Sequence, residues 1–548
     1  MKNYKSILAI FLCSFLLLSG CNTQNAVKEV SEIANASGID KVKEPTLNPA
    51  YTENSDPANW DIKWEILQNG EPVEEYKRDE DINFKKPEDY FSLEGVPTFR
   101  GNNYRNDASY GTADIFEEAL EISWTNTIGG LGKWTGCGWS GQPLIVRWEE
   151  STKEIMNIYP EKKQKIGLTE VIYATMDGNI YFYDIDDGKP TRDKLNIGMT
   201  FKGTGTLDPR GYPIMYIGSG IETESKSQRM FAINLIDTTV IYEQSGSDPD
   251  CYRSWPAFDS SPIIHAETDT LIWPGENGVL YTLKLNTKYN PEEKTITINP
   301  ENVAKVRYKI NHPSKKGRWV GFESSCVVVG NYLYVSDNIG IFYCVDLNTM
   351  ELIWAQDVLD DSNASPVFEW DSEGNGYIYT APSLRWTAQG EKGHTEIFKL
   401  DAQSGEVIWN VPYDCIRHGD TSGGVQSTPV VGRTGSDLEG LVICNVAFSP
   451  SGYTGKLVAL DSKTGETVWE HHMPNYTWSS PVGVYNPENK GYIIICDSTG
   501  KVKLIDGASG ELLSSVNIGS NVESSPAVFE NTLVVGTRGC RIYGIKIK

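Results

Sequence analysis

The sequence is short of basic residues. Its 49 Lys and Arg stand against 73 Asp and Glu, which gives a formal net charge of −24 at pH 7. Nucleic-acid binding needs a basic surface, so the composition argues against that class. Long amphipathic helical patterns are missing too, and the strongly apolar stretch Ile7–Leu18 is too short to cross a bilayer as a permanent helix.

Familiar catalytic motifs are also missing. The chain has six His and contains no His-Glu-x-x-His, no nucleophile elbow and no phosphate-cradling glycine loop. Asp184, Asp186 and Asp187 look like a fragment of a calcium loop, but their flanking residues follow the repeat described next. We therefore predict no catalytic residue and no metal ligand.

One phrase recurs along the chain: an apolar run, then Asp-x-x-Thr/Ser-Gly-Glu, then a Trp. It occurs at Leu457–Trp469, at Ile397–Trp409, at Phe342–Trp354 with Met350 in place of Gly, and as a degenerate copy at Val502–Ser514. Each copy reads as two strands joined by a tight turn, in which Asp and Thr/Ser bond the backbone and Gly takes a positive φ. A lone hairpin cannot bury its own faces, so the copies predict a repeat architecture.

A second piece, Ser-Ser-Pro followed by an apolar strand, precedes each phrase. Copies begin at Ser260, Ala364, Ser427, Ser479 and Ser524, and a copy at Ser324 has Cys326 in place of Pro. A third, β-rich piece follows each of them. Joined in order, the pieces form a four-stranded antiparallel meander, which is a propeller blade.

We count eight such units, although the degenerate second unit (203–242) leaves seven open. The last unit stops at Ile542–Lys548 without a closing strand, and Leu120–Thr127 has the form of that strand. Pairing the two would close the ring and remove its open edge. The prediction is an all-β, eight-bladed propeller, with the Trp residues at equivalent repeat positions packed between blades. These are Trp124, Trp354, Trp409 and Trp469.

The N-terminus reads as a targeting segment. Lys2 and Lys5 precede the apolar stretch, and Leu18-Ser19-Gly20-Cys21 resembles the lipobox of bacterial lipoproteins, which implies cleavage before Cys21 and lipid attachment to its thiol. An ordinary secretory signal is the alternative. The predicted divisions are a signal peptide (1–21), a flexible tether (22–57), an extension and lead-in (58–119) that includes a hairpin at Trp60–Val73, and the propeller (120–548).

The Ser-Ser-Pro, Asp-x-x-Thr-Gly-Glu and Trp pieces resemble the pyrroloquinoline-quinone-like (PQQ-like) repeat, found in quinoprotein alcohol dehydrogenases and in the outer-membrane β-barrel assembly lipoprotein. The dehydrogenase likeness implies PQQ with calcium, held under a disulfide between adjacent cysteines. This chain has no Cys-Cys pair and no Cys-x-x-Cys-His site. Cys137, Cys251 and Cys415 precede first strands of blades, where a disulfide remains open.

Loops that enter the innermost strands converge at the mouth of a propeller channel. Here four of them carry a cation near an aromatic or imidazole side chain. The candidate ligand-binding residues are Trp134, Arg253, Trp255, Arg318, Trp319, Arg417 and His418. They predict a mouth for an anionic glycan or a protein; the alternative is that Trp packs between blades and Arg bonds loop carbonyls.

The sequence thus predicts an extracytoplasmic propeller, anchored by lipid on Cys21 to a bacterial membrane at the cell surface or in the periplasm. Its predicted role is a non-catalytic binding or assembly scaffold without a cofactor. The alternatives are a PQQ-dependent oxidoreductase, in which PQQ and calcium would be bound, and a surface carbohydrate-binding lipoprotein. No nucleic-acid partner is expected.

Overall fold

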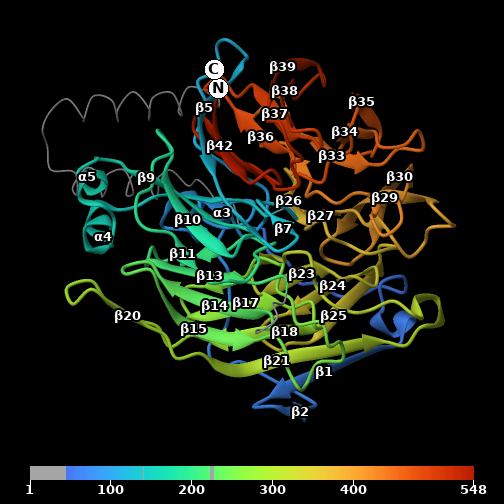
Figure 1. The fold of residues 1–548 in the computed structure, drawn as a ribbon. Helices are drawn as coiled ribbons and strands as arrows, with labels where there is room; N and C mark the ends of the chain where they lie inside the picture. The colour runs from blue at the N-terminus through green and yellow to red at the C-terminus, as the bar shows by residue number, and fades with distance from the viewer. Residues whose placement is uncertain (1–44, 140, 222–226) are drawn as a thin grey trace, which may run out of the picture. The chain divides into compact units, whose positions relative to one another are not determined.

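The computed structural model describes residues 45–548 except 140 and 222–226, and these residues are almost all in β-strands and turns (Figure 1). Residues 47–548 form one compact unit. The predicted signal peptide, Cys21 and most of the predicted tether lie outside the described residues. Within the described part of the chain, no helix has the length and apolar character needed to span a membrane.

Eight antiparallel sheets follow one another along the chain and form the blades of a propeller. Strands are named from the innermost outward. Blade 1 consists of β8 (Leu144–Arg147), β9 (Thr169–Ala174), β10 (Asn179–Asp184) and β11 (Leu195–Asn196), and blade 2 of β12 (Thr206–Leu207), β13 (Ile214–Gly218), β14 (Arg229–Asn234) and β15 (Thr239–Ser245). Blade 3 consists of β16 (Ile263–His265), β17 (Thr270–Pro274), β18 (Val279–Lys284) and β21 (Glu301–Ile310), and blade 4 of β22 (Val327–Val329), β23 (Tyr332–Ser336), β24 (Ile341–Asp346) and β25 (Leu352–Asp357). Blade 5 consists of β26 (Val367–Trp370), β27 (Gly376–Thr380), β29 (Lys392–Asp401) and β30 (Val407–Ile416), and blade 6 of β32 (Val430–Val431), β33 (Leu441–Ala447), β34 (Gly455–Asp461) and β35 (Thr467–Met473). Blade 7 consists of β36 (Val482–Tyr485), β37 (Gly491–Cys496), β38 (Lys501–Asp506) and β39 (Leu512–Asn517), and blade 8 of β40 (Ala527–Phe529), β41 (Thr532–Thr537), β42 (Arg541–Ile547) and β5 (Leu120–Thr127).

The remaining elements are short. Strands outside the blade cores are β1 (Ile62–Gln68), β2 (Glu71–Val73), β3 (Glu94–Val96), β4 (Ser109–Tyr110), β6 (Gly130–Leu131), β7 (Trp134–Thr135), β19 (Lys288–Asn290), β20 (Thr295–Thr297), β28 (Ser383–Leu384) and β31 (Gly423–Gly424). The helices are η1 (Pro57–Trp60), α3 (Pro87–Tyr90), α4 (Glu150–Ile155), α5 (Pro160–Lys163) and η2 (Pro313–Lys315).

The ring closes as the sequence predicts. Strand β5 pairs antiparallel with β42, with Trp124 opposite Gly544, and so completes blade 8. A Cβ at Gly544 would lie 2.1 Å from the Trp124 indole, which explains why this position has no side chain. The degenerate second unit is a complete four-stranded sheet, β12 to β15, so the count of eight blades is confirmed.

The Asp-x-x-Thr-Gly-Glu turn is an inter-blade joint. Gly465 has φ +75°, and a Cβ there would lie 3.0 Å from the Trp409 indole of the preceding blade. The same Trp donates from Nε1 to the carbonyl of Ser462 in that turn, at 3.1 Å. Trp124, Trp354 and Trp469 make the equivalent bond to the next blade, and all four indoles are buried. The predicted packing role of these Trp residues is therefore confirmed.

The Ser-Ser-Pro motif links the blades by hydrogen bonds near their inner edge. Its second hydroxyl accepts from the backbone N–H at the equivalent position of the preceding blade. The N–H of Gln142 donates to the hydroxyl of Thr204, and the same bond joins Ser261 to Ser325, Ser325 to Ser365, Ser365 to Thr428, Thr428 to Ser480, and Ser480 to Ser525, with the N–H donor named first in each pair. The ring is completed by the Ser261 hydroxyl, which donates to the carbonyl of Thr204, and by the N–H of Ser525, which donates to the carbonyl of Gly141.

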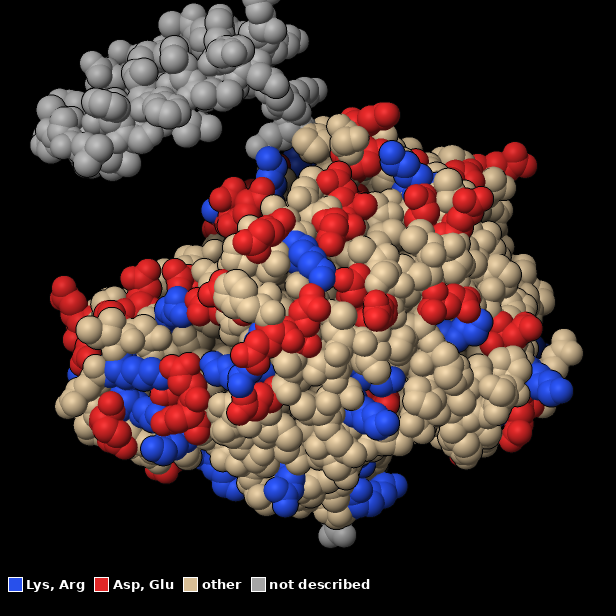
Figure 2. Space-filling view, turned by 90° about the horizontal axis from the view of Figure 1, so that it is seen from above, with Lys and Arg blue, Asp and Glu red and all other residues tan. Residues whose placement is uncertain are grey.

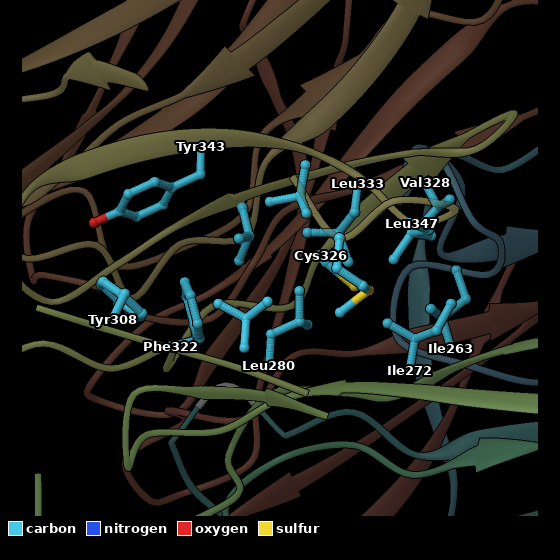
Figure 3. Close-up of a cluster of buried hydrophobic side chains, with 14 of the residues drawn as sticks. Ile263, Ile272, Leu280, Tyr308, Phe322, Cys326, Val328, Leu333, Tyr343 and Leu347 are labelled. Carbon is cyan, nitrogen blue, oxygen red and sulfur yellow. The ribbon is translucent and has the colours of Figure 1, made fainter. Parts of the chain in front are cut away.

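The hydrophobic core is divided among the blade interfaces. Figure 3 shows the interface between blades 3 and 4, where Ile263, Ile272 and Leu280 meet Val328 and Leu333. These side chains are at most 1% exposed. Each blade therefore buries its faces against its neighbours.

The N-terminal extension docks on the outside and the base of this ring. The predicted hairpin at Trp60–Val73 is confirmed as β1 and β2, with Asn69 and Gly70 in the turn, and β1 pairs with β21 as an added strand of blade 3. Residues 47–57, which the sequence places at the end of the tether, are held against blades 4 and 5. The N–H of Ala50 donates to Gln403, and the N–H of Ala355 donates to the carbonyl of Ser55.

Residues 97–110 fill the channel on the base face, where the turns between first and second strands lie. Arg100 donates to the carbonyls of Pro429 and Pro481, and Arg105 donates to those of Cys326 and Ser261. Both arginines are at most 1% exposed. Burial, against which nearby acidic groups act, lowers the pKa of Arg100 to about 10. The channel is therefore closed by the chain itself on this face.

Candidate functional site

The opposite face of the ring, the mouth face, carries the loops that enter each innermost strand. The residue directly before each Ser-Ser-Pro-type motif lies at the centre of this face. These residues, which we call the inner ring, are Lys202, Asp259, Glu323, Asn363, Gln426, Trp478 and Glu523 in the described residues. Neighbours contact one another across blade boundaries: Lys202 forms an ion pair with Asp259, and the side chain of Asn363 contacts that of Gln426 at 2.7 Å.

Three carboxylates converge at the inner ring. One oxygen each of Asp259, Glu276 and Glu323 lies within 4.8 Å of the others. Asp259 and Glu276 are only 8% and 3% exposed, and their atoms Oδ1 and Oε1 have no hydrogen-bond partner among the described residues. Buried carboxylate oxygens without a partner are costly, which makes this carboxylate cluster a candidate functional site.

Electrostatics at the cluster are dominated by negative charge. Burial alone would lower the pKa of Lys202, yet the carboxylates of Asp259, Glu276 and Glu323 raise it above its ordinary value. Burial, reinforced by the two neighbouring carboxylates, raises the pKa of Glu276 well above its usual range. Burial and then the charge of Glu323 raise the pKa of the adjacent Asp361 to about 8. The centre therefore favours added positive charge.

Trp139 crosses the middle of the mouth. Its φ of +57° is rare for so bulky a residue and marks a strained position. Its Nε1 donates to Glu323 at 2.7 Å, and the ammonium of Lys202 lies 4.4 Å from its ring centroid. The indole also packs against Trp134 and Trp478, with centroids 6.2 Å away in each case. One strained side chain from blade 1 thus joins blades 2, 4 and 7.

From Trp139 a run of aromatic rings leads outward over the mouth of blades 6 and 7. Trp478 contacts Tyr476 at 5.9 Å, Tyr476 contacts Phe448 at 4.3 Å, and the Tyr453 ring stacks on His418 at 4.2 Å with 10° between planes. Phe448 contacts both members of that stack, at 5.7 and 5.1 Å. Tyr453 is 61% exposed, so the run ends at a solvent-facing ring. We call these five rings, Trp478, Tyr476, Phe448, Tyr453 and His418, the aromatic run.

The predicted mouth residues are only partly brought together. The Arg253 guanidinium lies over the Trp319 ring at 5.3 Å, beside Arg385 and Trp386. Trp134 packs against Trp139, and His418 belongs to the aromatic run. Trp255 is partly exposed on the Arg253 loop.

The three predicted arginines all donate to loop carbonyls. Arg253 bonds Glu276 and Val320, Arg318 bonds Ile339 and Leu359, and Arg417 bonds Arg385 and Gly419. Their donors stabilise the mouth loops, as in the alternative role considered for them from the sequence.

The inner ring and Trp139 are functional candidates that sequence reasoning missed. Their signal was positional, because each inner-ring residue stands immediately before a repeated motif, while its type changes from blade to blade. Glu276, Asn338 and Trp386 come from other mouth loops and had no such signal. Asn338 donates to Asp361 at 2.8 Å and to Glu323 at 3.3 Å, and so connects the cluster to its neighbour.

Two other sequence features have structural roles. Lys162 pairs with Asp184 and Asp187, and Lys165 pairs with Asp184 and Asp186. Each of the three aspartates is therefore paired with a lysine of the α5 region.

Cys137, Cys251 and Cys415 are free thiols, as are the other described cysteines.

Comparisons with known proteins point to one family. A family model described as outer membrane protein assembly factor BamB matches residues 305–482. A quinone alcohol dehydrogenase subunit of Gluconobacter oxydans is 24% identical over 205 residues, which are 37% of this chain and 24% of that protein. A lanthanide-dependent methanol dehydrogenase of Methylacidiphilum fumariolicum is 26% identical over 187 residues, 34% of this chain and 28% of that protein. The matched segments thus span about a quarter of these relatives.

Solved structures agree on the fold. The quinohemoprotein alcohol dehydrogenase of Comamonas testosteroni has a TM-score of 0.53 at 13% identity, and covers 83% of this chain and 80% of its own. The enzyme ADHIIG of Pseudomonas putida HK5 has a TM-score of 0.55 at 11% identity with the same coverage. The family-model match over residues 305–482 and the repeats support a PQQ-like β-propeller, and the two solved structures agree with its fold.

Proposed function

We propose that the protein is an extracytoplasmic binding scaffold, anchored to a membrane by lipid on Cys21, whose ligand is a saccharide bound at the mouth without chemical conversion. The aromatic run carries this proposal. Saccharide rings present C–H faces that pack on aromatic faces, and their hydroxyls need planar polar partners beside those faces. Two nitrogens of the run itself, Nε1 of Trp478 and Nε2 of His418, have no hydrogen-bond partner among the described residues.

The described chain enters the propeller on the face opposite the mouth. The chain enters the propeller at Leu47, beside Gly376 and the Gln403 turn, and these lie on the base side of blade 5. Turns on that side and loops of the mouth lie at opposite ends of the strands. On the face seen in Figure 2, basic side chains stand among more numerous acidic ones, so this face has no continuous basic stripe. The point of chain entry and the aromatic run therefore lie on opposite faces of the ring.

Site-specific photo-crosslinking in intact cells tests the proposal. A photoreactive residue at Tyr453, which is 61% exposed, should capture ligand, and one at Phe116, which is 84% exposed and outside the run, should not. Mass spectrometry then identifies the adduct. Saccharide adducts that disappear in Tyr476→Ala support the proposal. Protein adducts alone would leave a scaffold with a protein partner, and equal labelling at both positions would refute a binding surface at the mouth.

An oxidoreductase is the second candidate, because the carboxylate cluster offers oxygens to a cation. PQQ with calcium would also need room beside the cluster. There Trp139 donates to Glu323 and covers Lys202, and Cys137 has no adjacent cysteine. The described residues therefore do not fit the quinone. Dye reduction by protein mixed with PQQ, calcium or lanthanum and a primary alcohol would overturn the non-catalytic role.

A further inference from the structure

A lysine ammonium lies at the point where three carboxylates converge. The Lys202 side chain is 4% exposed and pairs with Oδ2 of Asp259, which is equally buried. The pair packs closely against Gly220, where a Cβ would lie 2.2 Å from Oδ1 of Asp259 and 2.5 Å from Cδ of Lys202. The indole of Trp139 covers the ammonium from the other side at 4.4 Å.

We propose that Lys202 is a built-in cation of the propeller centre, which takes the position that a metal ion would otherwise hold among Asp259, Glu276 and Glu323. This inference concerns the carboxylate cluster and is independent of the aromatic run and its ligand.

With the lysine in place, few oxygens of the cluster remain free, and a second cation would lie against the ammonium. Both oxygens of Glu323 already accept, one from Trp139 and the other from Asn338. One oxygen of Asp259 is taken by Lys202, so Oδ1 of Asp259 and Oε1 of Glu276 remain. A metal ion at these two oxygens would lie beside the buried ammonium, and repulsion between like charges in a buried site opposes its binding.

The ammonium of Lys202 also provides the positive charge that compensates the carboxylate cluster. Three carboxylates within 4.8 Å cannot all ionise in a buried site without a compensating charge. The positive charge of Lys202 compensates the charge of its partner Asp259 and of the cluster around it. The neighbouring Arg253 contributes less directly, since its Nη2 is 3.9 Å from Glu276.

The proposal predicts that removing the ammonium creates a metal site. In Lys202→Met the side chain keeps a similar length, while both oxygens of Asp259 become available beside Glu276. We expect Tb³⁺ to bind this variant at least tenfold more tightly than the wild type, with luminescence excited through the nearby indole of Trp139. Ca²⁺ should compete for the site and raise the melting temperature of the variant alone.

Matched variants make the result specific. Lys503 is also buried, but Asp497 is its single paired carboxylate, at 3.9 Å. Lys503→Met should therefore create no terbium site, and Lys202→Met/Glu276→Gln should lose the one gained. If Lys202→Met folds only when Tb³⁺ or Ca²⁺ is present, the ion replaces the ammonium as proposed, and the double variant should fold without it.

Two outcomes would overturn the proposal. Saturable, chelator-reversible binding of Tb³⁺ by the wild type at this site, abolished by Glu276→Gln, would show that metal and lysine coexist. A folded Lys202→Met protein that gains no affinity, or one that neither ion rescues, would show that the ammonium does not stand in for a metal.

Discussion

Raised acid pKa values at the mouth make the stability of the protein depend on pH. Asp361 is 2% exposed, and burial together with the charge of Glu323 raises its pKa from 3.8 to about 8. Between these values the folded protein holds a proton on Asp361 that the unfolded chain releases. The stabilisation from this proton is complete below about pH 4 and is lost as the pH rises through 8.

The magnitude follows from one proton. A difference of one bound proton changes the free energy of unfolding by about 1.4 kcal/mol per pH unit, or about 2.7 kcal/mol between pH 5 and pH 7. Asp361→Asn keeps the shape of the side chain and an oxygen that can accept from Asn338, but it cannot ionise. The variant should therefore lose stability less steeply than the wild type over this range, by up to that amount.

Urea unfolding followed by circular dichroism at pH 5, 6, 7 and 8 measures the two slopes. Asp461→Asn is the matched control from a base-face turn. Although burial tends to raise the pKa of Asp461, donors from Thr464 and Lys463 lower it overall, so its contribution changes only below about pH 4. Its slope between pH 5 and pH 8 should match that of the wild type. Parallel curves for Asp361→Asn and wild type would refute the assignment of a retained proton to Asp361.

Three further predictions concern the scaffold. Gly465→Ala should lower the free energy of unfolding by about 2–4 kcal/mol, because positive φ and contact with Trp409 add, whereas Gly435→Ala, with φ +80° and nothing within 4 Å, should lower it by about 1 kcal/mol; equal losses in urea titrations would rule out the inter-blade contact. Ser365→Ala removes the acceptor of the buried Ser325 N–H and should lower stability by about 1–3 kcal/mol, while Ser365→Thr, which keeps a hydroxyl as Thr428 does, should retain most of it; similar melting temperatures for both would argue against the hydrogen-bonded ring. Deleting residues 120–127 should leave the edge of β42 unpaired and cause self-association, visible by light scattering, and a monomeric product of unchanged stability would contradict closure by β5.

The sequence predicted the scaffold well because its rules are local and repeat. Asp, Gly and Trp of the recurring phrase each have a role that a single hairpin and its neighbour reveal, and the missing last strand could be matched to Leu120–Thr127. The role of Ser-Ser-Pro was less visible. Its second hydroxyl serves the N–H of another blade, and only the register between blades shows that Ser325 meets Ser365.

The mouth was harder to predict for a different reason. Cations beside aromatic residues left two roles open, ligand-binding guanidinium groups or donors to loop carbonyls, because the positions of those carbonyls cannot be read from a sequence. In the structure Arg318 is used twice for such carbonyls, at 3.0 and 2.6 Å. An anionic ligand held by these groups would compete with bonds that the loops already use, and the proposed ligand is therefore assigned to the aromatic run.

The inner ring is where the eightfold repeat is broken. The scaffold around it repeats its motifs in most blades, yet the position before the Ser-Ser-Pro-type motif holds charged side chains in blades 2 to 4 and 8 and amide or indole groups in blades 5 to 7. Packing does not demand this variation, since the neighbouring motif carries the inter-blade bond. The charged residues of blades 2 to 4 lie at the carboxylate cluster, and Trp478 of blade 7 belongs to the aromatic run. The strained Trp139 contacts both groups. A substitution at Trp139 should therefore disturb both the ion pair at Lys202 and ligand capture at Tyr453, whereas changes at Lys202 or Tyr453 should remain separate.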